Sequence, residues 1–145
     1  MKRPEEVKLE FTRKWVRKAE DDFQVACNLS EGDGVHFYAA TFHAQQSAEK
    51  YLKAFLVWHQ IEFTKTHDIK VLLDLAGRMD STLPDALKDA VMLTPYGVEY
   101  RYPGDYPEVQ HADVQQAVEC ARRVREEILK RLPCQAGETG THFNS

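Results

Sequence analysis

One helical segment constrains the fold of this chain more than any other feature. Residues 37–56 read FYAATFHAQQSAEKYLKAFL and contain neither Gly nor Pro. Apolar side chains recur there every four residues, at Ala40, Ala44, Ala48, Leu52 and Leu56. This period places them on one face of an α-helix. The segment therefore predicts a helix whose narrow, alanine-rich face packs against other helices.

A row of polar residues runs beside that apolar stripe. His43, Gln46, Lys50 and Lys53 are spaced by three, four and three residues, which stacks them along one helix edge. Glu49 lies alongside, and Glu49 with Lys53 forms an i,i+4 pair worth about 0.2–0.5 kcal/mol. A ligand-binding edge and an ordinary solvated face explain this row equally well, so both interpretations stay open.

The composition indicates one globular domain. The chain has 145 residues, 43% hydrophobic and 29% charged, which suits a single core. A net charge of −4 argues against a general duplex nucleic-acid binder, although it leaves room for a local basic groove. Since the chain shows neither a long apolar run nor a signal-peptide pattern at MKRPEEVKLEF, we expect a cytoplasmic protein.

Metal, disulfide and cofactor sites are not indicated. The three cysteines, Cys27, Cys120 and Cys134, are far apart and form no C-x-x-C pair, so they predict no framework of disulfides. Cys27 and Cys120 lie on apolar helix faces and are expected to pack in the interior. No two histidines have the H-x3-H spacing of a helical zinc site. We therefore expect neither a metal nor a cofactor.

Periodicity predicts an all-α fold, an antiparallel up-and-down bundle of about five helices. The expected helices cover about 10–30, 37–59, 67–78 with Thr66 as N-cap, a stretch that starts near Pro84, and 111–132. An aromatic, Pro- and Gly-rich connection is expected at 94–109. The domain is expected to span 1–132, followed by a disordered tail at 133–145.

Two further segments carry polar groups that a bundle does not require. In Lys65-Thr66-His67-Asp68, capping and the helix dipole account for Thr66 and Asp68 but leave His67 unexplained. In Glu99-Tyr100-Arg101-Tyr102-Pro103, an arginine flanked by tyrosines suits stacking on a base or binding a phosphate. An internal Arg101–Asp68 salt bridge is the structural alternative.

Taken in order, these elements resemble the HEPN domain (higher eukaryotes and prokaryotes nucleotide-binding). The residues that carry the resemblance are QxxAEKxLKAxL ending at Leu56, then KTHDIKVLL, then YRYP, and it extends from about Trp15 to Leu132. It implies a bundle of about five helices, commonly a homodimer. Such genes often sit beside one for a minimal nucleotidyltransferase, and the pair can act as a toxin–antitoxin module. Many members are metal-independent ribonucleases.

The sequence departs from the motif of those ribonucleases. They carry R-x4–6-H, in which Arg binds the scissile phosphate and His assists proton transfer. Here nine residues separate Arg101 from His111, and no Arg in the chain precedes a His at the required distance. A site would have to assemble across space, from His67 and Arg101. The departure favours a binding module over an enzyme.

Three functions follow as hypotheses. The first is a non-catalytic module that binds a nucleotide, RNA or a nucleotidyltransferase partner. Its expected binding residues are His43, Gln46, Lys50, Lys53, His67, Asp68, Tyr100, Arg101 and Tyr102. The second is a metal-independent ribonuclease toxin with His67 as acid/base and Arg101 as phosphate clamp. The third is a dimerising scaffold whose aromatic loop, Tyr96 to Tyr106, binds a protein. The family resemblance also implies that the partner enzyme modifies a tyrosine of this loop.

Overall fold

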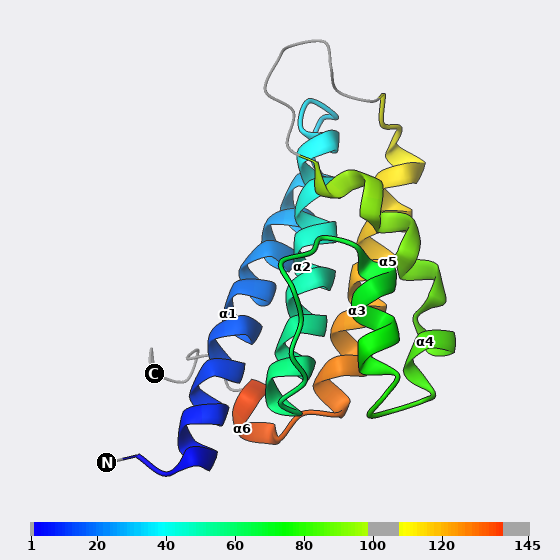
Figure 1. Cartoon of the computed structure of the whole chain (residues 1–145). Helices are drawn as coiled ribbons and strands as arrows, with labels where there is room; N and C mark the ends of the chain where they lie inside the picture. The colour runs from blue at the N-terminus through cyan, green and yellow to red at the C-terminus, as the bar shows by residue number, and fades with distance from the viewer. Residues whose placement is uncertain (1, 99–107, 138–145) are drawn as a thin grey trace.

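The computed structural model describes residues 2–98 and 108–137 and consists of helices (Figure 1). They are α1 (Pro4–Ser30), α2 (Phe37–Trp58), α3 (Ile69–Ala76), α4 (Leu83–Ala86), the 3-10 helix η1 (Lys88–Gly97), α5 (His111–Lys130) and α6 (Cys134–Gly137). No strand occurs within these ranges. The all-α prediction is confirmed.

The core lies where α1, α2 and α5 pack together, with α3 and η1 against the other side of α2. All five members of the predicted stripe on α2, from Ala40 to Leu56, are fully buried. The small alanines let the neighbouring backbones approach closely, while Tyr51 and Phe55 fill the wider parts of the core. Of the helices in the described ranges, none is long and apolar enough to cross a membrane.

α1 begins six residues earlier than its periodicity predicts, at Pro4 rather than at about residue 10. Proline suits the first turn because its missing N–H has no partner there in any helix. The negative charges of Glu5 and Glu6 in the same turn interact favourably with the positive end of the helix dipole and so stabilise this start. The result is a helix of 27 residues whose first turns extend past the rest of the bundle (Figure 1).

The link between α2 and α3 positions the polar residues. Gln60, with φ of 57°, ends α2, and the Ile61 N–H donates to the Leu56 carbonyl at 2.9 Å. The chain then runs back along α2, so that α3 starts beside the middle of α2 and points in the same direction as α2 (Figure 1). Asp68, not the predicted Thr66, is the N-cap, and its carboxylate accepts from the Lys70 N–H at 2.9 Å.

Two boundaries near the C-terminal side also differ from expectation. The predicted connection at 94–109 starts later, because η1 continues to Gly97 and includes Pro95. Within the segment expected as a tail, α6 forms a helical turn with Ala136 fully buried. Most of the aromatic connection, residues 99–107, and the end of the tail, 138–145, lie outside the described residues.

Candidate functional site

A buried carboxylate on α2 organises the segment that leads into α3. Glu49 is 3% exposed and accepts three hydrogen bonds. Lys53 Nζ lies 2.8 Å from Oε2, while His67 Nδ1 at 2.8 Å and Gln45 Nε2 at 3.1 Å share Oε1. We call these four residues the Glu49 cluster. Because a carboxylate only accepts, the imidazole proton of this pair resides on Nδ1.

The Glu49 cluster holds its carboxylate in the charged form. Burial alone raises the pKa of Glu49, but the hydrogen bonds from Lys53, His67 and Gln45 outweigh it, so that its pKa lies below the ordinary 4.5. Burying this charge is tolerable because it is paired and its lone pairs are satisfied. The cluster is therefore an ion pair with two further donors.

Lys53 belongs to the interior rather than to a ligand-binding edge. Only 7% exposed, its ammonium lies 5.6 Å from the Trp15 ring centroid and 5.7 Å from that of Phe63. The two rings pack edge to face, and such positions favour a cation electrostatically. Lys53 thus joins α1 to the connecting segment, which the sequence pattern did not reveal.

A second carboxylate, Asp22 of α1, accounts for two more residues of the predicted row. His43 Nδ1 lies 2.8 Å from Asp22 Oδ1, and Lys50 Nζ lies 2.5 Å from Oδ2. All three side chains are partly exposed, at 31% for His43, 23% for Lys50 and 13% for Asp22. We call them the Asp22 cluster. It bridges α1 and α2, and sequence reasoning missed Asp22 because nothing local marks it.

The amides of Gln45 and Gln46 extend the Glu49 cluster along α2. Gln46 Nε2 donates to Gln45 Oε1 at 2.7 Å, and Gln45 Nε2 also donates to the His67 carbonyl at 3.1 Å. Gln45 is fully buried, beneath Gly97 of η1. Gln45 therefore holds the segment before α3 by a hydrogen bond and packs against the end of η1.

The structure brings together some of the predicted site residues. His67 and Lys53 both bind the Glu49 carboxylate, and Gln46 is linked to His67 by way of Gln45. His43 and Lys50 both contact Asp22. Asp68 caps α3, which explains it structurally. Tyr100, Arg101 and Tyr102 lie outside the described residues, and so does the predicted Arg101–Asp68 salt bridge.

His67 is far more exposed than His43 or Lys50 of this set. Its side chain is 69% exposed, although Nδ1 is bound to a buried carboxylate. Nε2 forms no hydrogen bond within the described part of the chain. No group of three or more His, Cys, Asp or Glu side chains in that part is arranged to hold a metal. An oriented imidazole is thus the principal reactive group here.

Comparison with known proteins decides the family. The family model of the HEPN domain matches residues 12–132, which is most of the chain. This chain belongs to the HEPN family. The crystal structure of an archaeal HEPN homologue is similar, with a TM-score of 0.65 and 27% identity over 90% of this chain and 98% of the homologue. No curated protein matches the sequence.

Membership gives the site its context. The match includes α1 from Thr12, all of α2 and α3, and α5, so both carboxylate clusters lie inside the HEPN domain. At the level of the family, the chain is a module associated with nucleotides and RNA.

Proposed function

We propose that this HEPN domain is a non-catalytic module that binds a phosphate group of a nucleotide or of RNA through His67. The observation that supports this is an imidazole 69% exposed yet held at Nδ1 by a carboxylate that is itself buried. When both ring nitrogens carry a proton, Nδ1–H stays bound to Glu49 and Nε2–H points to solvent in one orientation, as a donor to a phosphate oxygen. Holding the ring in this way lowers the entropy lost when a ligand binds. Arg101 would hold a second phosphate oxygen, and Tyr100 or Tyr102 would stack on a base.

The charge balance favours binding over catalysis. In the free protein Lys53 is paired with Glu49 and Lys50 with Asp22, so that neither lysine is available to stabilise the charge of a transition state. The absence of R-x4–6-H from the sequence agrees with this. His43 and Lys50, which both pair with Asp22, and the neutral amide of Gln46 would also contact the ligand.

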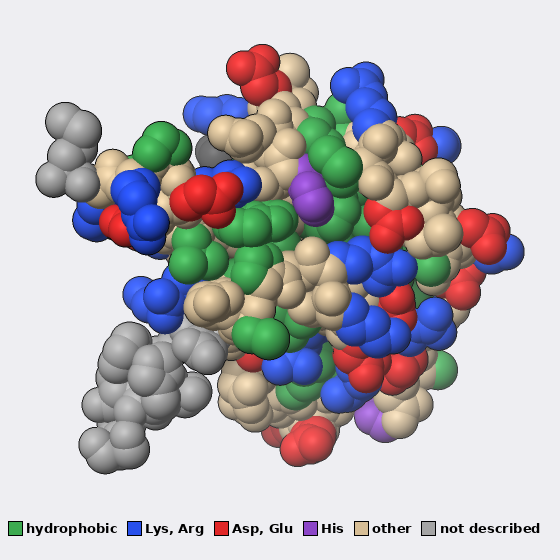
Figure 2. Space-filling view, turned by 90° about the horizontal axis from the view of Figure 1, so that it is seen from below, with side chains coloured by type: hydrophobic (Ala, Val, Ile, Leu, Met, Phe, Trp, Pro, Cys, Tyr) green, Lys and Arg blue, Asp and Glu red, His purple; other side chains and the backbone are tan. Residues whose placement is uncertain are grey.

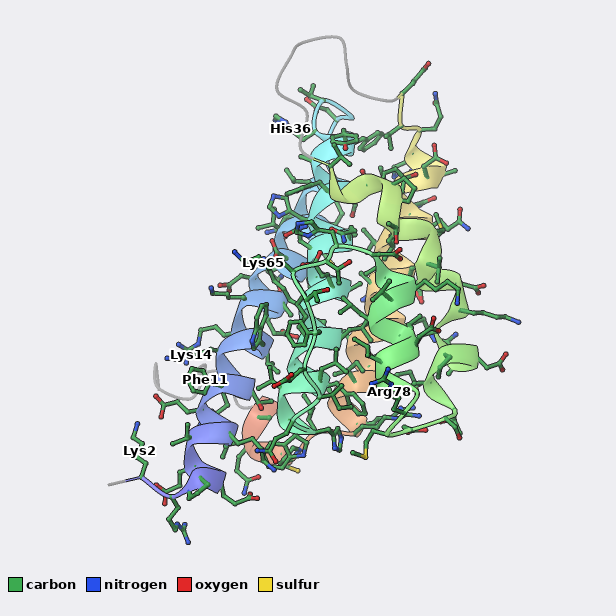
Figure 3. All side chains as sticks on the ribbon, viewed as in Figure 1. Lys2, Phe11, Lys14, His36, Lys65 and Arg78 are labelled. Atoms are coloured by element: carbon green, nitrogen blue, oxygen red, sulfur yellow. The ribbon has the colours of Figure 1, made fainter. Side chains whose placement is uncertain are left out.

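The test measures ligand binding at the His67 imidazole by NMR. On titration with ATP, and separately with a short 5′-phosphorylated RNA, we expect its proton NMR signals to shift and His67→Gln to weaken binding about tenfold. His36→Gln is the matched control, since His36 is also exposed and lies at the start of α2 (Figure 3). Signals of His67 that stay unmoved at millimolar ligand would reject the proposal.

A metal-independent ribonuclease is the second candidate, and the carboxylate–imidazole pair is what favours it. Glu49 would hold His67 in one tautomer, leaving Nε2 to take the proton from a 2′-hydroxyl whose oxygen attacks phosphorus. The P–O5′ bond would break in the same reaction, and the leaving 5′-oxygen would take up a proton from water or from the protonated ring. Arg101 would bind the phosphate. RNA incubated with the protein and a chelator distinguishes the two functions: cleavage that is lost in His67→Ala establishes the nuclease, and intact RNA at high protein concentration excludes it.

Family resemblance also motivates the proposed partners, a second copy and a minimal nucleotidyltransferase in a toxin–antitoxin pair. Light scattering should give twice the chain mass of 16.7 kDa. Co-expression with the product of an adjacent nucleotidyltransferase gene should yield a stable complex, and mass spectrometry would detect a nucleotide added to a tyrosine of the loop from Tyr96 to Tyr106. A complex that forms with neither ligand binding nor modification would support the scaffold role instead.

A further inference from the structure

Positive charge is concentrated at the start of α1. Residues 2–18 contain seven Lys or Arg and three Glu, a net charge of +4 in a chain whose total is −4. The remaining residues therefore carry −8. Because the cations are concentrated in one segment, the electrostatic potential near the start of α1 is positive although the chain as a whole is negative. Salt screens this potential only beyond about 10 Å at 0.1 M ionic strength.

Three of these cations, Lys14, Arg17 and Lys18, share one exposed edge of the helix, whereas three others are paired with glutamates. Lys2, Arg3 and Lys8 each pair with a glutamate of α1. Lys14, Arg17 and Lys18 are exposed and form no salt bridge with a described residue, although Lys14 interacts electrostatically with Glu10 one turn earlier. Their spacing of three and one places them within about one turn on the same side of the helix.

An exposed aromatic ring lies next to these cations. Phe11 is 51% exposed, and Lys14 Nζ lies 5.3 Å from its ring centroid. Figure 3 shows both residues on the side of α1 turned away from the other helices. Phe11, Lys14, Trp15, Arg17 and Lys18 line an open groove of about 290 Å³. In Figure 2, hydrophobic side chains likewise surface among Lys and Arg side chains at the end of the molecule where α1 begins.

We propose that this face of α1, the α1 groove, binds single-stranded RNA. Lys14, Arg17 and Lys18 would contact successive phosphates, and the Phe11 ring would stack on a base. A positive groove with an exposed ring is the combination that binds single strands without sequence preference. An acidic protein segment would use the three cations equally well but would have no use for the ring. The site goes beyond the His67 proposal, since none of its residues belongs to either carboxylate cluster.

The experiment measures binding of a 5′-fluorescein 12-residue oligouridylate to the intact chain by fluorescence anisotropy at several salt concentrations. The triple variant Lys14→Ala, Arg17→Ala, Lys18→Ala should bind at least tenfold more weakly. Its plot of log K against log salt should be shallower by about 2, since single strands contribute roughly 0.7 per phosphate contact. Phe11→Ala and Phe11→Leu should each weaken binding about tenfold without changing that slope.

The matched control removes three exposed cations from other elements, Lys70, Arg78 and Lys88. An equal loss of affinity in the control triple overturns the proposal, because it would indicate only a general charge effect. Unchanged affinity in both Phe11 variants, or equal competition by polyglutamate and by RNA, overturns it in favour of an acidic partner. His67→Gln should retain the dependence on Phe11, so that this site and the His67 site fail or succeed separately.

Discussion

Nδ1 of His67 lies 2.8 Å from Oε1 of Glu49, and this contact joins an exposed ring to a carboxylate that is 3% exposed. It links the segment between α2 and α3 to the middle of α2. The same carboxylate also pairs with Lys53. Glu49 therefore has two roles that experiments can separate. It stabilises the bundle by pairing with Lys53, and it orients the imidazole of His67.

Replacing Glu49 by Gln should destabilise the fold strongly. The variant keeps the shape of the side chain but leaves the Lys53 ammonium, 7% exposed, without a counter-charge. Breaking one partner of a buried pair costs about 3 kcal/mol or more. Urea unfolding followed by circular dichroism measures the difference in free energy of unfolding.

An exposed pair with the same spacing supplies the control. Lys70 and Asp74 are also i,i+4 neighbours, but their side chains are 65% and 60% exposed. Asp74→Asn should change the free energy of unfolding by less than about 1 kcal/mol. Similar losses in the two variants would mean that burial does not distinguish the pairs, contrary to our description of the Glu49 cluster.

The contribution of Glu49 should depend on pH. Its pKa in the folded state lies below the ordinary 4.5. A lowered carboxyl pKa stabilises the fold fully above the unfolded value, and this stabilisation is lost as pH falls through the folded value. The gap in unfolding free energy between wild type and Glu49→Gln should therefore narrow below about pH 4.5. A gap that stays constant down to about pH 3 would contradict the assignment of Glu49 as a charged, hydrogen-bonded group.

The sequence predicted which apolar side chains are buried better than it predicted which polar side chains contact one another. The alanine stripe of α2 has a period that only a buried helix face satisfies, and Ala40, Ala44 and Ala48 are fully buried. Polar partners follow no such period. Asp22 and Lys50 are 28 residues apart, and Glu49 and His67 are 18 apart. Such pairs arise from how α1 and the connecting segment lie against α2, which no local spacing encodes.

The start of α3 illustrates the same limit at shorter range. Thr66 and Asp68 are both good N-caps, so that composition alone did not choose between them. The Ile69 N–H donates to Thr94 Oγ1 of η1 at 3.2 Å, a tertiary contact that helps to fix the first turn beyond Asp68. Boundaries decided by contacts of this kind require the packed structure.

Gly97→Ala should disturb the candidate site from η1. A methyl group there would lie 2.9 Å from Cδ of Gln45, whose side chain is fully buried and bonded to Glu49 and to the His67 carbonyl. Displacing this amide should cost about 1–3 kcal/mol and shift the His67 NMR signals. Gly32→Ala is the control, since its nearest contact is the Leu29 carbonyl at 3.4 Å. Equal stability of the two variants, with His67 unmoved, would show that Gln45 does not transmit packing to the site.

Asp22→Asn tests whether the polar row of α2 binds phosphate. Asp22 Oδ1 contacts His43 Nδ1, and Oδ2 neutralises the Lys50 ammonium. Removing the carboxylate's charge should therefore release this cation toward any phosphate bound along that edge. Affinity for ATP should increase about three- to tenfold at low salt, measured by calorimetry. Loss of one charged hydrogen-bond network should cost about 1–2 kcal/mol of stability.

The neighbouring Asp21→Asn provides the matched control for this prediction. Asp21 also lies on α1 but is exposed, and its substitution changes the net charge of the chain by the same amount. If the row binds phosphate, Asp22→Asn must increase affinity more than Asp21→Asn, and the difference must shrink as salt screens the released charge. Equal effects would reduce the Asp22 cluster to a structural bridge between α1 and α2, and would confine ligand binding to the surface around His67.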